Sequence, residues 1–180
     1  VSMYCTQIIN QEDTLFYCPL DVIESFYKDE LVRLNECKVI FLGDGNVGKS
    51  SLIDRIVDDE FYEEKKATDG ISIRNWRAKI CESDVQIRFW DFGGQEIMHT
   101  MHLCFLTNRT IYVIVLDSRQ DQYLEMIAND WMQTVNTFAP KCPIILVLNK
   151  CDTNPMVLMN LNNLKTRFPQ LVGYVITSAK

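Results

Sequence analysis

The chain has 180 residues, 47% of them apolar, and a formal net charge of −6. This length and apolar content predict one domain with a sizeable core plus a short extension. The negative charge argues against a broad nucleic-acid surface, and no apolar run approaches the length of a transmembrane segment. Seven cysteines without C-x-x-C spacing are typical of reduced residues in a cytoplasmic protein, not of a disulfide framework.

Residues 1–34 are interpreted as an N-terminal extension, and residues 35–180 as the main domain. The first twenty residues show no clear periodicity. Residues 21–34 have the pattern of a helix, because Val22, Phe26 and Leu31 fall on one broad face. Both a helix packed on the domain and a connector from an upstream module fit this pattern.

Strands and helices alternate through the main domain. The expected strands are residues 36–42, 71–80, 85–90, 110–117, 143–148 and 173–177. The expected helices are residues 49–57, 96–106, 123–138 and 156–168. Residues 82–84 are expected to form a hairpin turn between the second and third strands. This order predicts an α/β fold with a six-stranded, mostly parallel, doubly wound sheet and one antiparallel edge strand. The aromatic and methionine side chains of residues 123–138 are expected in the core.

Residues 43–50 read G-x-x-x-x-G-K-S, the phosphate-binding loop of nucleoside triphosphatases, and lie between an expected strand and an expected helix. The glycines allow successive backbone N–H groups to point at an anion, and the start of the helix adds its positive dipole end. Lys49 is expected to reach the outer phosphates, and the Ser50 hydroxyl to bind magnesium. The expected nucleotide contacts in this segment are Gly43, Gly45, Asn46, Val47, Gly48, Lys49, Ser50 and Ser51.

Asn149-Lys150-x-Asp152 follows the expected fifth strand and indicates selection of guanine. The base presents its N1–H and 2-amino groups side by side, and the Asp152 carboxylate can accept from both. Adenine lacks that pair of donors and would leave the carboxylate unpaired. Asn149 is expected either to bond the base edge or to brace the phosphate loop. The stem of Lys150 is expected to lie along the base.

Two other segments are candidates for contact with the base. A backbone N–H of Ser178, Ala179 or Lys180 can donate to the 6-oxo group of guanine. Phe61 is expected to pack on the base edge, to anchor in the core or to be an exposed loop aromatic.

Asp91-x-x-Gly94-Gln95 lies at the end of the third expected strand and indicates phosphoryl transfer. Asp91 is expected to hold magnesium through water, Gly94 to offer an N–H to the terminal phosphate, and Gln95 to orient the attacking water. Thr68 can complete the magnesium shell when a third phosphate is present. The letters D-F-G at residues 91–93 also occur in protein kinases, but no H-R-D catalytic loop precedes them.

These motifs together resemble a small Ras-like GTPase. Residues 90–99, W-D-F-G-G-Q-E-I-M-H, look like the signature of the bacterial Roc GTPase domain of Roco proteins, as do residues 105–107, 115–119 and 148–152. The resemblance covers about residues 35–180. It implies guanine-nucleotide switching between GTP and GDP with Mg²⁺, slow hydrolysis, a following COR domain that mediates homodimerisation, and leucine-rich repeats upstream. The last helix of that fold is expected after Lys180 and is missing from the chain.

The leading functional hypothesis is a GTPase switch in signalling that hydrolyses GTP to GDP and phosphate. The alternative is a nucleotide-gated interaction or dimerisation module with negligible turnover. An ATP-using phosphotransferase is disfavoured by Asn149 and Asp152. Catalysis is expected to involve Lys49, Thr68 and Gln95. Arg119, beyond the fourth strand, is either a solvated loop arginine or a group that reaches the phosphates of a facing subunit.

Overall fold

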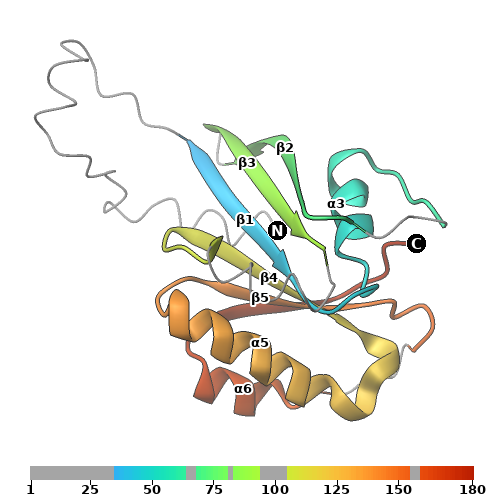
Figure 1. Ribbon diagram of the computed structural model, residues 1–180, viewed down its shortest axis with the longest axis vertical. Helices are drawn as coiled ribbons and strands as arrows, with labels where there is room; N and C mark the ends of the chain where they lie inside the picture. Colours follow the sequence, from blue (N-terminus) through green and yellow to red (C-terminus); the bar gives the residue numbers. More distant parts are fainter. Residues whose placement is uncertain (1–34, 64–67, 81–82, 94–104, 155–158) are drawn as a thin grey trace, which may run out of the picture.

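A single six-stranded sheet organises the computed structural model, which describes residues 35–63, 68–80, 83–93, 105–154 and 159–180. The strand order is β2-β3-β1-β4-β5-β6, with β2 antiparallel to β3 and the other neighbours parallel (Figure 1). The strands are β1 (Glu36–Leu42), β2 (Ile71–Ile80), β3 (Ser83–Phe92), β4 (Thr110–Asp117), β5 (Ile144–Asn149) and β6 (Leu171–Ile176). This arrangement confirms the predicted fold class.

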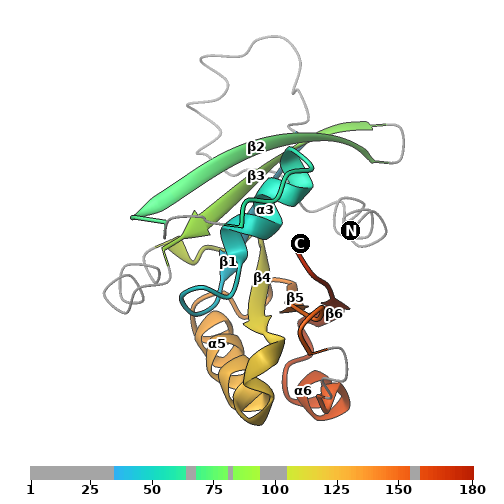
Figure 2. The ribbon, with the colours of Figure 1, turned by 90° about the vertical axis from the view of Figure 1, so that its right-hand side faces the viewer.

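Helices lie on both faces of the sheet, as Figure 2 shows. Helix α3 (Lys49–Val57) covers one face, whereas α5 (Leu124–Phe138) and α6 (Leu161–Arg167) cover the other. A short 3₁₀ segment, η2 (Ser118–Tyr123), leads from β4 into α5. All eight residues of β4 are buried, which explains why residues 111–116 of this central strand are an unbroken apolar run.

Two apolar clusters form the core, one on each face of the sheet. Leu52 and Ile53 of α3 pack with Phe41 of β1 and Phe89 of β3 in the first cluster. The second cluster joins α5 and α6 to the opposite face of the central strands and includes Ile40, Leu42, Ile114, Leu116, Leu124, Ala128, Met132, Val135, Leu146 and Leu164. The strands that end beside the phosphate loop are therefore packed on both faces.

The antiparallel hairpin is longer than predicted. Ser83 and Asp84, expected in the turn, belong to β3 and pair with Ile80 and Lys79 of β2. The backbone hydrogen-bond ladder continues to the pair of Ile80 and Ser83, although the polar residues Ser83 and Asp84 resemble a turn. At the other end β3 extends to Phe92, so that Asp91 lies within the strand.

The starts of two helices also differ from prediction. The predicted helix 123–138 begins at Leu124, after η2. The predicted helix 156–168 begins at Leu161, because the Asn160 side chain accepts a hydrogen bond from the N–H of Asn163 and caps the helix there. Most of the predicted helix 96–106 and all of residues 1–34 lie outside the described residues.

The prediction that the aromatic and methionine side chains of residues 123–138 lie in the core is correct for only two of them. Trp131 and Met132 are in the core, but Tyr123 and Met126 are each 57% exposed and Phe138 is 45% exposed. Within the described part of the chain, no helix has the length and apolar character needed to span a membrane.

Candidate nucleotide-binding site

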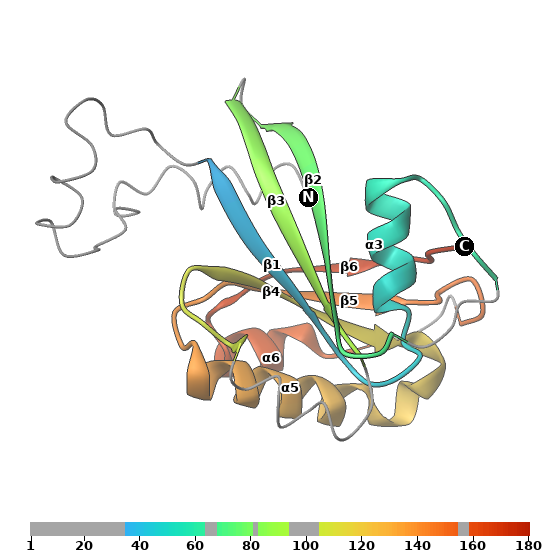
Figure 3. The same cartoon turned by 45° about the horizontal axis from the view of Figure 1, so that its top comes forward.

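The carboxyl ends of β1, β4 and β5 meet at one edge of the sheet (Figure 3). The phosphate loop follows β1, and the registers place Leu42 beside Ile114 and Asp117 beside Asn149. In an open, mostly parallel sheet this edge is where ligands bind. The topology thus brings the phosphate loop and the Asn149 motif together although about a hundred residues separate them in the chain.

Lys49 lies within the phosphate loop. Its Nζ donates to the carbonyl oxygens of Gly43 and Asp44, each at 2.8 Å, and the residue is only 5% exposed. Burial lowers the pKa of the Lys49 ammonium, and the charges of Asp91 and Asp44 partly offset that effect. The ammonium is therefore held where phosphate oxygens can accept its hydrogen bonds.

Asn149 braces the phosphate loop, which is one of the two roles considered for it. Its Nδ2 donates to the carbonyl oxygen of Val47 at 2.9 Å, and its Oδ1 accepts from the N–H of Ala179 at 3.2 Å. Gly48 lies directly against this amide, since a Cβ there would be 2.3 Å from Asn149 Nδ2. Gly48 also has φ +96°, a conformation that other residues rarely adopt.

Gly48→Ala is expected to lower the free energy of unfolding by about 3 kcal/mol, because it adds a clash with Asn149 to the strain of a positive φ. Gly70→Ala is the matched control: its φ is +76°, but an added Cβ meets nothing within 4 Å. It should cost about 1 kcal/mol from strain alone. Urea unfolding of both variants measures the difference, and equal losses would show that Gly48 is needed for its backbone conformation only.

The three residues predicted to hold magnesium, Ser50 and Thr68 directly and Asp91 through water, converge beside the loop. The Ser50 Oγ and Thr68 Oγ1 are 2.7 Å apart, and both hydroxyls donate to Asp91 Oδ2, from Thr68 at 3.2 Å and from Ser50 over a shorter distance. The Thr68 carbonyl lies close to Gly93, which leaves room for it because an added Cβ there would be only 2.4 Å from the carbonyl oxygen. Two hydroxyls and one carboxylate are oxygen ligands of the kind Mg²⁺ prefers, so the residues fit this metal.

The Asn149-Lys150-x-Asp152 segment, the guanine motif, contacts the residues that follow β6. Asp152 is exposed, and its Oδ1 accepts a hydrogen bond from Ser178 Oγ at 2.7 Å. The N–H of Lys180 donates to the same hydroxyl at 3.2 Å, and the N–H of Ala179 donates to Asn149. With the N–H of Ser178, these two N–H groups were the candidates for the 6-oxo group of guanine, and Ala179 or Lys180 would have to exchange its present partner to donate to the base.

Lys150 connects the guanine motif to the phosphate loop and to β4. Its Nζ donates to the carbonyl oxygen of Asn46 and, at 2.9 Å, to Asp117 Oδ2. Asp117 is 5% exposed and also accepts from Arg119 NH2 at 2.6 Å and Arg119 Nε at 2.9 Å. Burial raises the pKa of the Asp117 carboxyl, but hydrogen bonds from Arg119 and Lys150 outweigh it and hold the pKa at about 2.

Sequence reasoning missed Asp117. The available signal was a carboxylate that directly follows the apolar run of residues 111–116, at the sheet edge that carries the other motifs. Arg119 is paired with that carboxylate and has a side chain 54% exposed, at the position that sequence reasoning assigned to it beyond β4.

The remaining predicted residues are distributed around the loop. Gly43 and Val47 are buried, Gly45 is exposed and Ser51 is half-buried in the first turn of α3. Phe61 is half-buried and packs against the core cluster of α3, so it is anchored in the core in this structure. Gly94 and Gln95 lie outside the described residues.

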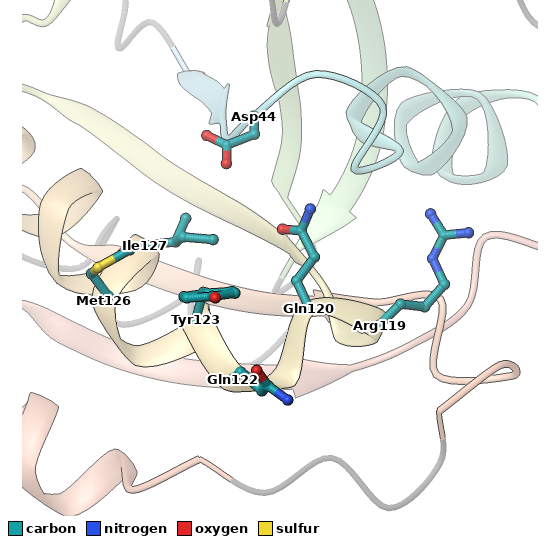
Figure 4. Close-up of a pocket in the computed structure, with 7 residues that line it drawn as sticks. All are labelled: Asp44, Arg119, Gln120, Gln122, Tyr123, Met126 and Ile127. Atoms are coloured by element: carbon teal, nitrogen blue, oxygen red, sulfur yellow. The ribbon is translucent and has the colours of Figure 1, made fainter.

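A groove of about 500 Å³ runs between the phosphate loop and the start of α5 (Figure 4). Asp44 lies on one side, and Gln120, Tyr123 and Met126 lie on the other. Trp131 Nε1 donates to Asp44 Oδ1 at 3.2 Å and links α5 to the loop. The groove was not predicted, because it depends on which α5 side chains remain outside the core.

The fold and the site define a phosphate-loop domain of the Ras-like class. A family model described as "Ras of Complex, Roc, domain of DAPkinase" matches residues 38–152. The chain belongs to this Roc family, within the Ras-like GTPase superfamily.

Individual relatives agree with this assignment. The chain is 32% identical over 154 residues to Ras-related protein Rab-18 of Caenorhabditis elegans, covering 84% of this chain and 75% of that protein. The probable serine/threonine-protein kinase pats1 of Dictyostelium discoideum is 26% identical over 179 residues, which cover 83% of this chain and 5% of that protein. The solved structure of Methanosarcina barkeri Roco2 RocCORdC bound to GDP superimposes with a TM-score of 0.76 and 37% identity, covering 88% of this chain and 48% of that chain. The chain thus spans about half of the solved Roco chain.

Proposed function

We propose that this domain binds guanine nucleotide with Mg²⁺ and acts as a GTPase switch that hydrolyses GTP to GDP and phosphate. The observation that carries the proposal is the joining of the guanine motif to the phosphate loop through Asn149 and Lys150. The GDP in the Methanosarcina Roco2 relative supports the choice of nucleotide. The exposed Asp152 carboxylate, held by Ser178, is available for the two donors of guanine.

Each residue has a defined part in this mechanism. Lys49 and the backbone N–H groups of the loop orient the phosphates. Ser50, Thr68 and Asp91 would hold Mg²⁺, which neutralises charge on the phosphate oxygens when bound. Thr68 contacts Ser50 and Asp91 from a separate loop, so its engagement can report the third phosphate. Gln95 is proposed to orient the attacking water.

The proposal also covers the wider context of the domain. The solved Roco2 chain is a RocCOR protein, which supports a COR domain as partner of this domain. We extend the proposal to a homodimer of the full protein, to leucine-rich repeats upstream of residues 1–34 and to a cytoplasmic location.

Phosphate release over many turnovers tests hydrolysis. With GTP and Mg²⁺ the protein should release more phosphate than one equivalent per site, and EDTA should stop the release. Tight GTP binding with less than one equivalent released would favour the alternative, a nucleotide-gated interaction module with negligible turnover.

Arg119 is proposed to assist hydrolysis at a facing subunit. An arginine on the transferring phosphate is worth about a thousandfold in rate. Arg119 would have to leave Asp117 to supply it. Turnover per site should therefore rise with protein concentration, and Arg119→Ala should flatten that rise. Mixing Arg119→Ala with Lys49→Ala chains should restore activity at mixed sites. Turnover independent of concentration in a dimerising protein, unchanged by Arg119→Ala, would rule the arginine out.

A further inference from the structure

Lys150 adopts a backbone conformation that needs support. Its φ is +64°, in the left-handed region that residues with a Cβ rarely occupy. The carbonyl oxygen of Lys150 accepts hydrogen bonds from Ser118 Oγ at 2.9 Å and Thr153 Oγ1 at 2.8 Å. Ser118 is completely buried at the end of β4, so this contact ties the guanine motif to the central strand.

The Lys150 side chain is held from the same place. Asp117, the residue before Ser118, accepts from Lys150 Nζ, which also donates to Asn46 of the phosphate loop. A buried carboxylate is costly unless it is paired and hydrogen-bonded. Asp117 therefore keeps the Lys150 ammonium close to the loop.

We propose that Asp117 and Ser118 are a positioning pair that holds Lys150 against the phosphate loop and thereby slows the release of guanine nucleotide. The pair supports Lys150 at both ends, with a carboxylate on its ammonium and a hydroxyl on its carbonyl. This inference rests on the proposed function. Neither residue has to touch the nucleotide, since both act through Lys150, which lies between the base site and Asn46.

Asp117 also binds Arg119, so its role must be separated from a purely structural one. If the carboxylate served only to fix Arg119 and η2, its loss would act independently of Lys150. If it acts through Lys150, its loss has no further effect once the Lys150 ammonium is gone. A double-mutant cycle distinguishes these cases.

The experiment measures dissociation of a fluorescent GDP analogue from dilute protein in Mg²⁺, where contacts between subunits do not contribute. Asp117→Asn keeps the side-chain shape and removes the charge, and Lys150→Met removes the ammonium. Each should speed release by about tenfold, the usual value of one charge-assisted hydrogen bond. The double variant should release at the rate of Lys150→Met alone. Asp130→Asn, the same change on an exposed carboxylate of α5, is the matched control and should match the parent.

Two further measurements keep the result unambiguous. Urea unfolding of the nucleotide-free variants checks that Asp117→Asn folds. Ser118→Ala, which removes only the hydroxyl on the Lys150 carbonyl, should also speed release and serves if Asp117→Asn does not fold.

Release from Asp117→Asn at the parent rate, or effects that multiply to about a hundredfold in the double variant, would overturn this inference alone. A parent protein that binds no guanine nucleotide would overturn the proposed function and this inference with it.

Discussion

Replacing Asp152 by Asn is expected to weaken GDP binding by about a hundredfold or more, because two hydrogen bonds from guanine to a charged acceptor are lost. Xanthosine diphosphate should become the better ligand, since its 2-oxo group accepts where guanine donates. The exposed position of Asp152 and its single bond from Ser178 leave the carboxylate available for the base. Competition titrations against a fluorescent nucleotide measure both changes.

Ser178→Ala is the comparison variant for Asp152→Asn. It leaves the Asp152 carboxylate in place and removes only the hydroxyl that orients it, so its loss of GDP affinity should be smaller and its preference for guanine over xanthine should remain. A loss of guanine preference as large in Ser178→Ala as in Asp152→Asn would show that Asp152 does not read the base.

Lys49→Ala should lower nucleotide affinity by a comparable factor, because it removes a contact with the phosphates instead of one with the base. The buried ammonium already donates to two carbonyl oxygens of the loop. It is therefore preorganised, and it can donate to phosphate oxygens with little loss of side-chain entropy. Charge-assisted bonds of this kind predict a loss of about a hundredfold in affinity, larger for GTP than for GDP.

Lys79→Ala is the control for Lys49→Ala. Lys79 is exposed on β2, far along the hairpin from the loop, and its removal should leave both affinities unchanged. Titrations of the two variants with GDP and GTP make the comparison. If Lys49→Ala bound GTP like the parent protein, the phosphates would not lie in this loop.

Those parts of the fold with a strong local signal were predictable from the sequence. Residues 111–116 of the buried strand β4 form an unbroken apolar run, and the glycine-rich loop follows a strand and opens a helix. Because parallel strands end at the same edge of a sheet, the prediction could also associate Asp91, Ser50 and Asn149 before any distance was known. The hydrogen bonds around Asp91 are consistent with that association.

Features that depend on three-dimensional neighbours could not be predicted. The apolar pattern of the sequence does not show where α6 begins, and the hydrogen bond from the Asn163 N–H to the Asn160 side chain marks its start at Leu161. The helical pattern of residues 123–138 does not predict that Tyr123 and Met126 stay exposed beside the phosphate loop.

The role of Asp117 likewise depends on contacts between strands. Its carboxylate meets Lys150 only because β4 and β5 pair in a register that places Asp117 beside Asn149. Thirty-three positions separate Asp117 from Lys150 in the chain, and no sequence motif joins them.

Direct titration of the purified, nucleotide-free protein with GDP and with ADP in the presence of Mg²⁺ tests the central claim most directly. Because adenine leaves the Asp152 carboxylate without its two donors, GDP should bind at least about a hundredfold more tightly than ADP. Binding of ADP as tight as that of GDP would contradict the assignment of this site to guanine nucleotides.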